Sequence, residues 1–283
     1  MTAMSQPLPD GLPVGRFMIP DPEWNDGTTF TGPQSWVSDE YVPDISAQWR
    51  RLLGQHAKTG WWPLLLTGPA IPPHLFARLT DELRRKRAGQ PWHTGQIQPA
   101  SAEGIDDLDP EAILSRWWRG IFRGGSDEFD FGEDSLPRPP LPGWPGLAAA
   151  EPIRDDPDRV ALEVVGSPDG IREMIGGRRT PYLGLVPAAD GAAAIPVCGW
   201  DPRGGDPTET GAVVRSWQRR FGARLCALGS KSFAVTVAAP PRTTAQAVKV
   251  TAEHLALLGD LGHDFDTYAA ALIDDHVWSF WWD

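Results

Sequence analysis

The last third of the chain shows a regular alternation of hydrophobic segments, and this alternation predicts strands and helices in turn. Short apolar runs bounded by glycine or proline predict strands at residues 182–186, 224–228 and 233–237. The turn at residues 229–232 joins the second and third of these as a hairpin. Apolar residues at helical spacing follow Asp206, Thr243 and Asp264, and each of these three residues is a good helix N-cap.

The chain as given closes on an aromatic segment that predicts one more strand. In an extended chain, alternate side chains point to opposite faces. One set is then Val277, Ser279 and Trp281, and the opposite set is Trp278, Phe280 and Trp282. Because both faces carry large rings, we expect both to be covered, with the N-terminal half of the chain as the simplest cover and a partner protein as the other.

The order of these elements is β-α-β-β-α-(α)-β, which is the order of the split-βαβ, ferredoxin-like fold. We therefore expect an α+β fold in which this sheet packs against an irregular, aromatic-rich N-terminal α/β region. In that region the sequence predicts a helix after Asp44, a buried strand at 61–67 and a helix after Asp109.

The distribution of proline and glycine suggests two domains. We expect an N-terminal region at residues 1–123, a Pro/Gly-rich linker at 124–157 and a C-terminal α+β domain at 158–283. The proline run at 136–143 could instead dock into an aromatic groove of a partner.

The charge balance excludes some classes of partner. The 283 residues carry a net charge of −11, which disfavours nucleic-acid binding and suits a basic protein partner. No apolar run approaches the roughly 18 residues of a membrane span, and the N-terminus does not resemble a signal peptide, so we expect a cytoplasmic protein. Cys198 and Cys226 lie in apolar segments and are expected to be buried, reduced thiols, with a disulfide as the alternative.

Several linked motifs resemble one bacterial family. They are Leu183-Gly184-Leu185-Val186-Pro187, Val214-Arg215-Ser216-Trp217, Arg220-Phe221-Gly222, Ala252-Glu253-His254 and the closing Trp278-Ser279-Phe280-Trp281-Trp282-Asp283. In this order they resemble the family called domain of unknown function 4253, over about residues 180 to 283. The resemblance implies a bacterial protein and brings no established activity. Members usually carry a cysteine-containing cluster shortly after the Glu-His pair, and residues 257–263 lack it.

Four residues near the end of one predicted helix are candidate catalytic groups: Glu253, His254, Asp260 and His263. Carboxylates and imidazoles serve as general bases and metal ligands. However, adjacent residues on a helix point about 100° apart, and the spacing matches no metal motif. A structural role is favoured, with a catalytic role as the alternative. No metal or other cofactor is expected.

Two groups of arginines are candidate anion ligands. They are Arg215, Arg219 and Arg220 on one predicted helix, and Arg178 and Arg179 before the first strand of the C-terminal part. Guanidinium groups bind carboxylates and phosphates, but compensation of the helix dipole and surface ion pairs are favoured here. The candidate interaction or structural aromatics are Trp217, Trp278, Phe280, Trp281 and Trp282.

The leading hypothesis is a non-enzymatic protein-interaction module, with an immunity-like or antitoxin-like role as one version by analogy. The alternative is a hydrolase or transferase of unrecognised type that uses Glu253, His254 and neighbouring arginines or aspartates. Convergence of Glu253 and His254 in a deep cleft would favour the enzyme, and divergence of their side chains would count against it.

Overall fold

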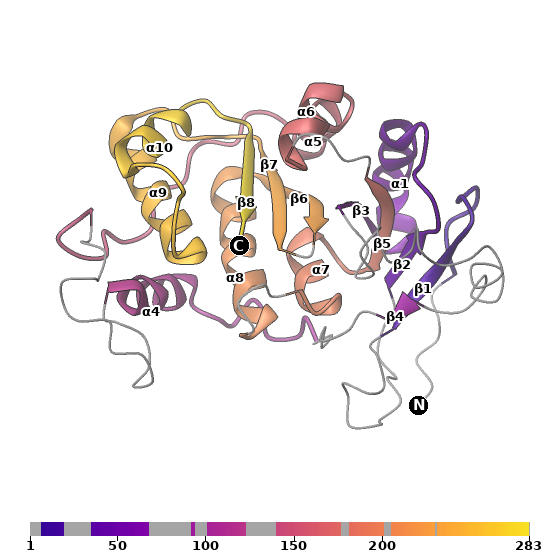
Figure 1. Ribbon diagram of the computed structural model, residues 1–283, viewed down its shortest axis with the longest axis horizontal. Helices are drawn as coiled ribbons and strands as arrows, with labels where there is room; N and C mark the ends of the chain where they lie inside the picture. The colour runs from indigo at the N-terminus through magenta and orange to yellow at the C-terminus, as the bar shows by residue number, and fades with distance from the viewer. Residues whose placement is uncertain are drawn as a thin grey trace.

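A computed structural model of the chain describes residues 7–19, 35–67, 92–93, 101–122, 140–176, 181–200, 205–229 and 231–282 (Figure 1). Within these ranges one mixed sheet of eight strands runs through the molecule, in the order β4-β1-β2-β5-β3-β6-β7-β8. The strands are β1 Gly15–Ile19, β2 Ser35–Ser38, β3 Trp61–Thr67, β4 Trp92–His93, β5 Tyr182–Pro187, β6 Ala223–Gly229, β7 Ser232–Val237 and β8 Val277–Trp281. The pairs β1/β4 and β3/β6 are parallel, and the other neighbours are antiparallel.

Helices cover both faces of this sheet. They are α1 Ile45–Thr59, α4 Pro110–Phe122, α5 Pro157–Val165, α6 Pro168–Met174, α7 Gly191–Val197, α8 Pro207–Phe221, α9 Thr244–Leu258 and α10 Phe265–Ala271. The alternation along β8 separates two layers: Ser279 donates to a carbonyl of α6, whereas the ring of Phe280 stacks on Trp217 of α8. Helices α1 and α5 lie with α6 on one face, and α7 and α9 lie with α8 on the other, with α4 packed outside α8 and α9.

The α+β fold class expected from the sequence is confirmed, and so are the helix starts in the C-terminal part. Asp206, Thr243 and Asp264 each accept a hydrogen bond from a backbone amide in the first turn of the helix that follows. Helix α8 ends at Gly222, whose φ of 63° is in the left-handed region that glycine adopts without steric cost. Cys198 and Cys226 are free thiols, and Cys226 is fully buried.

The ferredoxin-like strand order is wrong. That order would place the first strand of the C-terminal part beside the last, but β8 pairs with β7, and β5 pairs with β2 and β3. Strand β3 of the N-terminal part lies between β5 and β6. Its residues 61–65 are all buried, as suits a central strand with helices on both faces. Strands from both sides of the expected linker at 124–157 therefore share one sheet.

The expected cover of the aromatic tail is also corrected. Rings of the C-terminal part contact its inward rings: Trp217 stacks on Phe280, Phe221 meets Trp278 edge-on, and Trp200 meets Trp282 edge-on. Among the described residues, the N-terminal half supplies β1 to β4, α1 and α4. No helix within the described ranges is long and apolar enough to cross a membrane.

Candidate functional site

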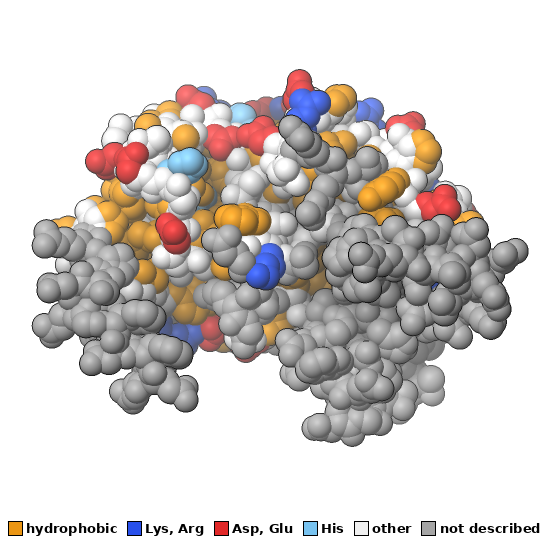
Figure 2. Space-filling view, in the orientation of Figure 1, with side chains coloured by type: hydrophobic (Ala, Val, Ile, Leu, Met, Phe, Trp, Pro, Cys, Tyr) orange, Lys and Arg blue, Asp and Glu red, His pale blue; other side chains and the backbone are white. Residues whose placement is uncertain are grey.

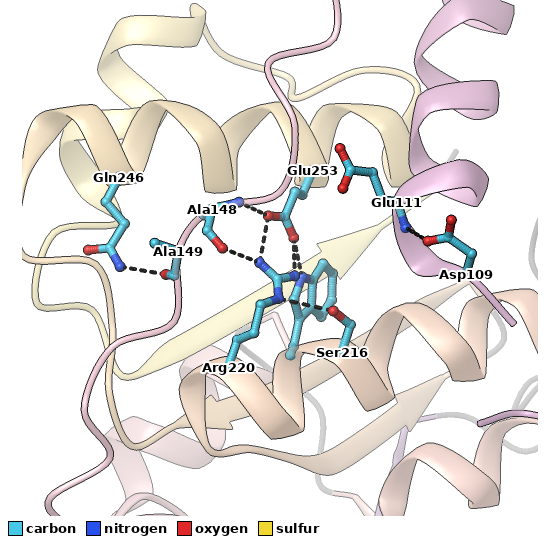
Figure 3. A network of polar contacts seen from close by, with 9 residues as sticks. Asp109, Glu111, Ala148, Ala149, Ser216, Arg220, Gln246 and Glu253 are labelled. Carbon is cyan, nitrogen blue, oxygen red and sulfur yellow. Dashed lines mark hydrogen bonds and ion pairs between the residues drawn. The ribbon is translucent and has the colours of Figure 1, made fainter. Parts of the chain in front are cut away.

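Glu253 is a fully buried carboxylate with four hydrogen-bond donors around it. Its Oε1 accepts from the backbone N–H of Ala148 at 2.8 Å and from Nη1 of Arg220 at 2.8 Å. Its Oε2 accepts from Nε1 of Trp217 at 2.8 Å and from Nη2 of Arg220 at 2.6 Å. Helices α8 and α9 lie side by side and point Arg220 and Glu253 at each other (Figure 3). The bidentate ion pair with Arg220 neutralises the charge of the buried Glu253 carboxylate.

The same groups hold an extended segment against α8 and α9. Arg220 also donates from Nη1 to the carbonyl of Ala148 at 2.9 Å and from Nε to Ser216 at 3.0 Å. Gln246 of α9 donates to the carbonyl of Ala149 at 3.0 Å (Figure 3). We call Trp217, Arg220, Gln246, Glu253 and the backbone of residues 148–149 the α8–α9 network. It anchors a part of the chain that the sequence predicts as linker.

His254 lies next to Glu253 in sequence but faces a different environment. Its ring contacts the rings of Trp217, Trp278 and Phe280 at centroid distances of 5.2, 4.8 and 4.7 Å. Burial, reinforced by the charge of Arg220, lowers the pKa of His254 to about 3, so the imidazole is neutral near pH 7. Its Nδ1 lies 3.1 Å from the hydroxyl of Tyr268, whereas Nε2 has no hydrogen-bond partner within the described residues.

Glu253 and His254 thus diverge inside the protein. Glu253 contacts Arg220, and His254 contacts aromatic rings and Tyr268. Both side chains have no exposed surface, and the hollows beside α4, α8 and β8 in the described part of the chain are lined by other residues. The arrangement stabilises the packing of α8 against α9 and gives neither group access to a substrate.

Asp260 and His263 lie apart from this pair, on the surface after α9. Asp260 accepts the backbone N–H of Gly262 at 3.0 Å, which shapes the turn into α10. Both residues line a hollow of about 460 Å³, together with apolar side chains such as Phe122 and Phe265. No group of three or more His, Cys, Asp or Glu side chains in the described ranges could hold a metal ion.

The three arginines of α8 line one small hollow of about 130 Å³, but each is paired with a carboxylate. Arg215 pairs with Asp190 and Asp106, Arg219 donates to Asp106 at 2.8 Å, and Arg220 pairs with Glu253. Because these carboxylates neutralise the three guanidinium groups, we expect only weak attraction of an added anion. Arg178 and Arg179 lie outside the described residues.

The predicted interaction aromatics divide into buried and exposed members. Trp217, Trp278 and Phe280 are buried, and Trp282 is half-buried against Trp200. Trp281 is 66% exposed, more than any other Trp, Tyr or Phe side chain whose burial the structure describes. The tail therefore presents one uncovered ring, on the side of the sheet that α6 covers.

Trp281 lies on a strand at the edge of the sheet, and no other strand of the described residues pairs with its outer side. Val237 donates to the carbonyl of His276, and Trp282 donates to the carbonyl of Lys231. In an antiparallel pair such hydrogen-bonded positions alternate, so the amides of Ser279 and Trp281 point away from β7. We call the outward backbone of residues 277–281 and the ring of Trp281 the β8 edge. Sequence reasoning singled out Trp281, but strand pairing is needed to find the edge.

A hollow of about 430 Å³ opens beside this edge, between α6, the end of β3, the β6–β7 hairpin and β8. We call it the β8 hollow. Its polar and aromatic lining residues are Thr67, Glu173, Lys231, Ser232, Ser279, Phe280 and Trp281. Hydrophobic, acidic and basic side chains reach the surface along β8 on this face of the molecule (Figure 2).

Comparison with known proteins identifies the C-terminal third and nothing beyond it. The model of the family described as "Domain of unknown function (DUF4253)" matches residues 182–283, as the motifs of the sequence indicate. No curated protein and no solved structure matched the chain. The matched region begins with β5 and contains both the α8–α9 network residues on the helices and the whole of β8.

Proposed function

We propose that this protein is a non-enzymatic interaction module that binds an extended segment of another protein along the β8 edge. The observation that carries the proposal is the combination of outward backbone groups on an edge strand with a ring, Trp281, that is 66% exposed. An extended peptide can add to such an edge as a further strand, with main-chain hydrogen bonds giving affinity and side-chain contacts giving specificity.

The chemistry of β8 supports an edge built for pairing. Sheet edges are usually blunted by bulges, prolines or inward charges, because unpaired strands attract other chains. Among the described residues, only the first outward amide of β8 has a hydrogen-bond acceptor: Val277 donates to the carboxylate of Asp275 at 2.9 Å. The next outward positions, Ser279 and Trp281, carry neither proline nor charge. A partner strand would therefore find two amides that have no acceptor among the described residues, and the carbonyls between them.

The α8–α9 network supports the interaction hypothesis over the enzyme. Three of the candidate groups, Glu253, His254 and Arg220, are engaged or enclosed inside the protein. The net charge of −11 suits a basic partner, as in an immunity-like or antitoxin-like role. The family resemblance and the two free thiols suit a bacterial cytoplasmic setting.

Selection from a displayed library of random peptides of about twelve residues tests the proposal, since this length spans the whole edge. Peptides are selected on the wild-type protein alone, and the affinity of each enriched peptide is then measured on the wild type and on Ser279→Pro. Proline at an outward edge position removes a free amide and leaves the β7 ladder intact, so the variant is expected to fold. Far-UV circular dichroism and a melting curve check this.

We expect enriched peptides that bind the wild type and lose at least about tenfold in affinity, or about 1.4 kcal/mol, on Ser279→Pro. A matched control is Val14→Ala, because Val14 is 80% exposed far along the sheet, beside β1. This control should bind as the wild type does. Equal binding to Ser279→Pro, or the absence of any enriched peptide, would contradict docking at the β8 edge.

A further inference from the structure

We infer that the carboxylate of Asp275 ends the ladder of hydrogen bonds that a docked segment forms with the β8 edge, an inference that rests on the proposed function. The segment pairs with Ser279 and Trp281 and leaves the edge at Val277. Asp275 thereby sets the length and the register of the partner strand, which the outward amides alone would leave open.

The amide of Val277 is the outward donor nearest the start of β8, and Asp275 already occupies it. Val237 of β7 donates to the carbonyl of His276, so the next N–H of β8, that of Val277, points away from β7. Oδ1 of Asp275 accepts this N–H at 2.9 Å. The carboxylate therefore lies where the carbonyl of an added strand would have to lie in order to pair with Val277.

A strand that continued past Ser279 would have to displace this carboxylate or lie against it. A backbone amide has one N–H to donate, and both an ionised carboxylate and a peptide carbonyl only accept hydrogen bonds. Two acceptors that meet without a donor between them leave one of them unsatisfied, which costs free energy. Charges directed at a sheet edge are a common means of limiting strand pairing. Pairing is therefore favourable at Ser279 and Trp281 and unfavourable at Val277.

The charge state of Asp275 decides how strictly the ladder ends. Burial, together with the charge of Glu173, raises the pKa of Asp275 to about 6. Above this pH the carboxylate only accepts. Below it, the neutral carboxyl can keep the hydrogen bond from Val277 and donate its own O–H to a partner carbonyl. A docked segment then gains one more hydrogen bond, so binding should strengthen as the pH falls through about 6.

The groups that face Asp275 come from three parts of the chain. Glu173 of α6 raises its pKa by like charge, whereas His276 and the hydrogen bond from the amide of Val277 lower it. On α10, burial and the charge of Asp275 raise the pKa of Tyr268, so this phenol stays neutral near pH 7. A variant that changes Asp275 alone keeps all of these neighbours, and its pH profile therefore isolates this carboxyl.

The test uses the full chain and one labelled, end-capped selected peptide without Asp, Glu or His, whose affinity is measured by fluorescence anisotropy. Asp275→Asn keeps an acceptor for the amide of Val277 and adds two N–H donors. We expect this variant to bind about fivefold tighter than the wild type at pH 7. Far-UV circular dichroism and a melting curve check its fold.

Asp274→Asn is the matched control. It removes the same charge one residue earlier, from an exposed side chain that makes no hydrogen bond to the described part of β8. Asparagine also tolerates the left-handed backbone of this position, whose φ is 56°. Its affinity for the peptide should stay within about twofold of the wild type.

Two further measurements address the switch and the end of the ladder. From pH 7 to pH 5 the wild type should gain about threefold or more in affinity, and Asp275→Asn should change little. Cross-strand NOEs between peptide and protein at pH 7 should stop at Ser279 in the wild type and extend to Val277 in Asp275→Asn.

Failure of this inference can be told apart from failure of docking. Equal affinities of the wild type and Asp275→Asn, an equal gain for Asp274→Asn, or NOEs that reach Val277 in the wild type at pH 7 would overturn the role of Asp275, while docking at the edge stands. Binding that survives Ser279→Pro, or the absence of any enriched peptide, would overturn docking and the role of Asp275 with it.

Discussion

The helical residues of the α8–α9 network and the β8 edge belong to the same matched region. Polar and aromatic groups are paired and buried in the network, whereas they are outward-facing and exposed at the edge. In the network, each oxygen of Glu253 has two donors from the same chain. At the edge, the outward amides of Ser279 and Trp281 face away from the sheet and a tryptophan ring lies open. Within the single strand β8, Trp278 is 1% exposed and Trp281 is 66% exposed. The difference agrees with the proposal that the first region maintains the fold and the second binds a partner.

The largest expected loss of stability comes from removing a ring on the covered side of β8. Trp278→Ala removes a ring that packs on Phe221, Trp217 and His254, and we expect a loss of about 3–5 kcal/mol in the free energy of unfolding, measured in denaturant. Trp278→Phe is the matched control, because the indole N–H makes no hydrogen bond within the described ranges. It should lose much less. Equal losses for the two variants would show that packing of the ring is not what stabilises this side.

The next effect breaks the network without changing its shape. Glu253→Gln leaves the guanidinium of Arg220 beside a neutral amide, and we expect a loss of about 3 kcal/mol in unfolding free energy. The loss lies at the low end for buried pairs because Arg220 keeps the carbonyl of Ala148 and the hydroxyl of Ser216. Asp169→Asn, in an exposed ion pair with Arg172, should lose less than about 1 kcal/mol. A similar small loss for Glu253→Gln would refute the structural role.

A smaller effect concerns pH. The pKa of His254 is lowered to about 3 in the folded protein, below its ordinary value of 6.5, so the unfolded chain binds the extra proton between these values. Stability should therefore fall as the pH falls through this window, by about 1.4 kcal/mol per pH unit. The His254→Gln variant should lack this contribution, and denaturant unfolding from pH 7 to 4.5 measures the difference.

The titration of Asp275 changes stability with pH in the opposite direction to that of His254, so its contribution must be removed from the comparison. Its pKa is raised to about 6, mainly by burial, so its contribution is present at low pH and is lost as the pH rises through about 6. Both proteins are therefore compared in an Asp275→Asn background. Parallel pH profiles for the two would show that His254 is not held neutral by its surroundings.

The smallest expected effect on stability separates the exposed ring of β8 from the buried one most clearly. Trp281→Ala removes a ring that is largely in water, and we expect a change of no more than about 0.5 kcal/mol in unfolding free energy. The same variant should lose binding of the selected peptides. A loss of stability as large as that of Trp278→Ala would mean that Trp281 is part of the core.

Local signals predicted the elements well, and long-range pairing was the part that sequence could not supply. The caps at Asp206 and Thr243 lie beside the helices they begin, so they could be read directly. The starts of α5 and α6, Asp156 before Pro157 and Ser167 before Pro168, carry the same signal and could have been predicted from it. Nothing local indicates that β3 enters between β5 and β6, because that pairing joins segments more than 100 residues apart.

The candidate residues show the same limit. Glu253 and Arg220 were identified as polar groups of interest, but their pairing depends on how α8 lies against α9. The backbone amide of Ala148 completes the site, and a backbone donor leaves no mark in a sequence. Alternation identified the two faces of β8. Which face stays uncovered depends on where the helices pack, and this requires the three-dimensional structure.

Amide hydrogen exchange along β8 tests the central claim most directly. In the free protein, the amides of Trp278 and Phe280 should be protected by β7, and those of Ser279 and Trp281 should exchange rapidly. On addition of a saturating selected peptide, Ser279 and Trp281 should become protected as a new strand pairs with the edge. Protection of these two amides in the free monomer, or exchange that the bound peptide leaves unchanged, would contradict a docking edge at β8.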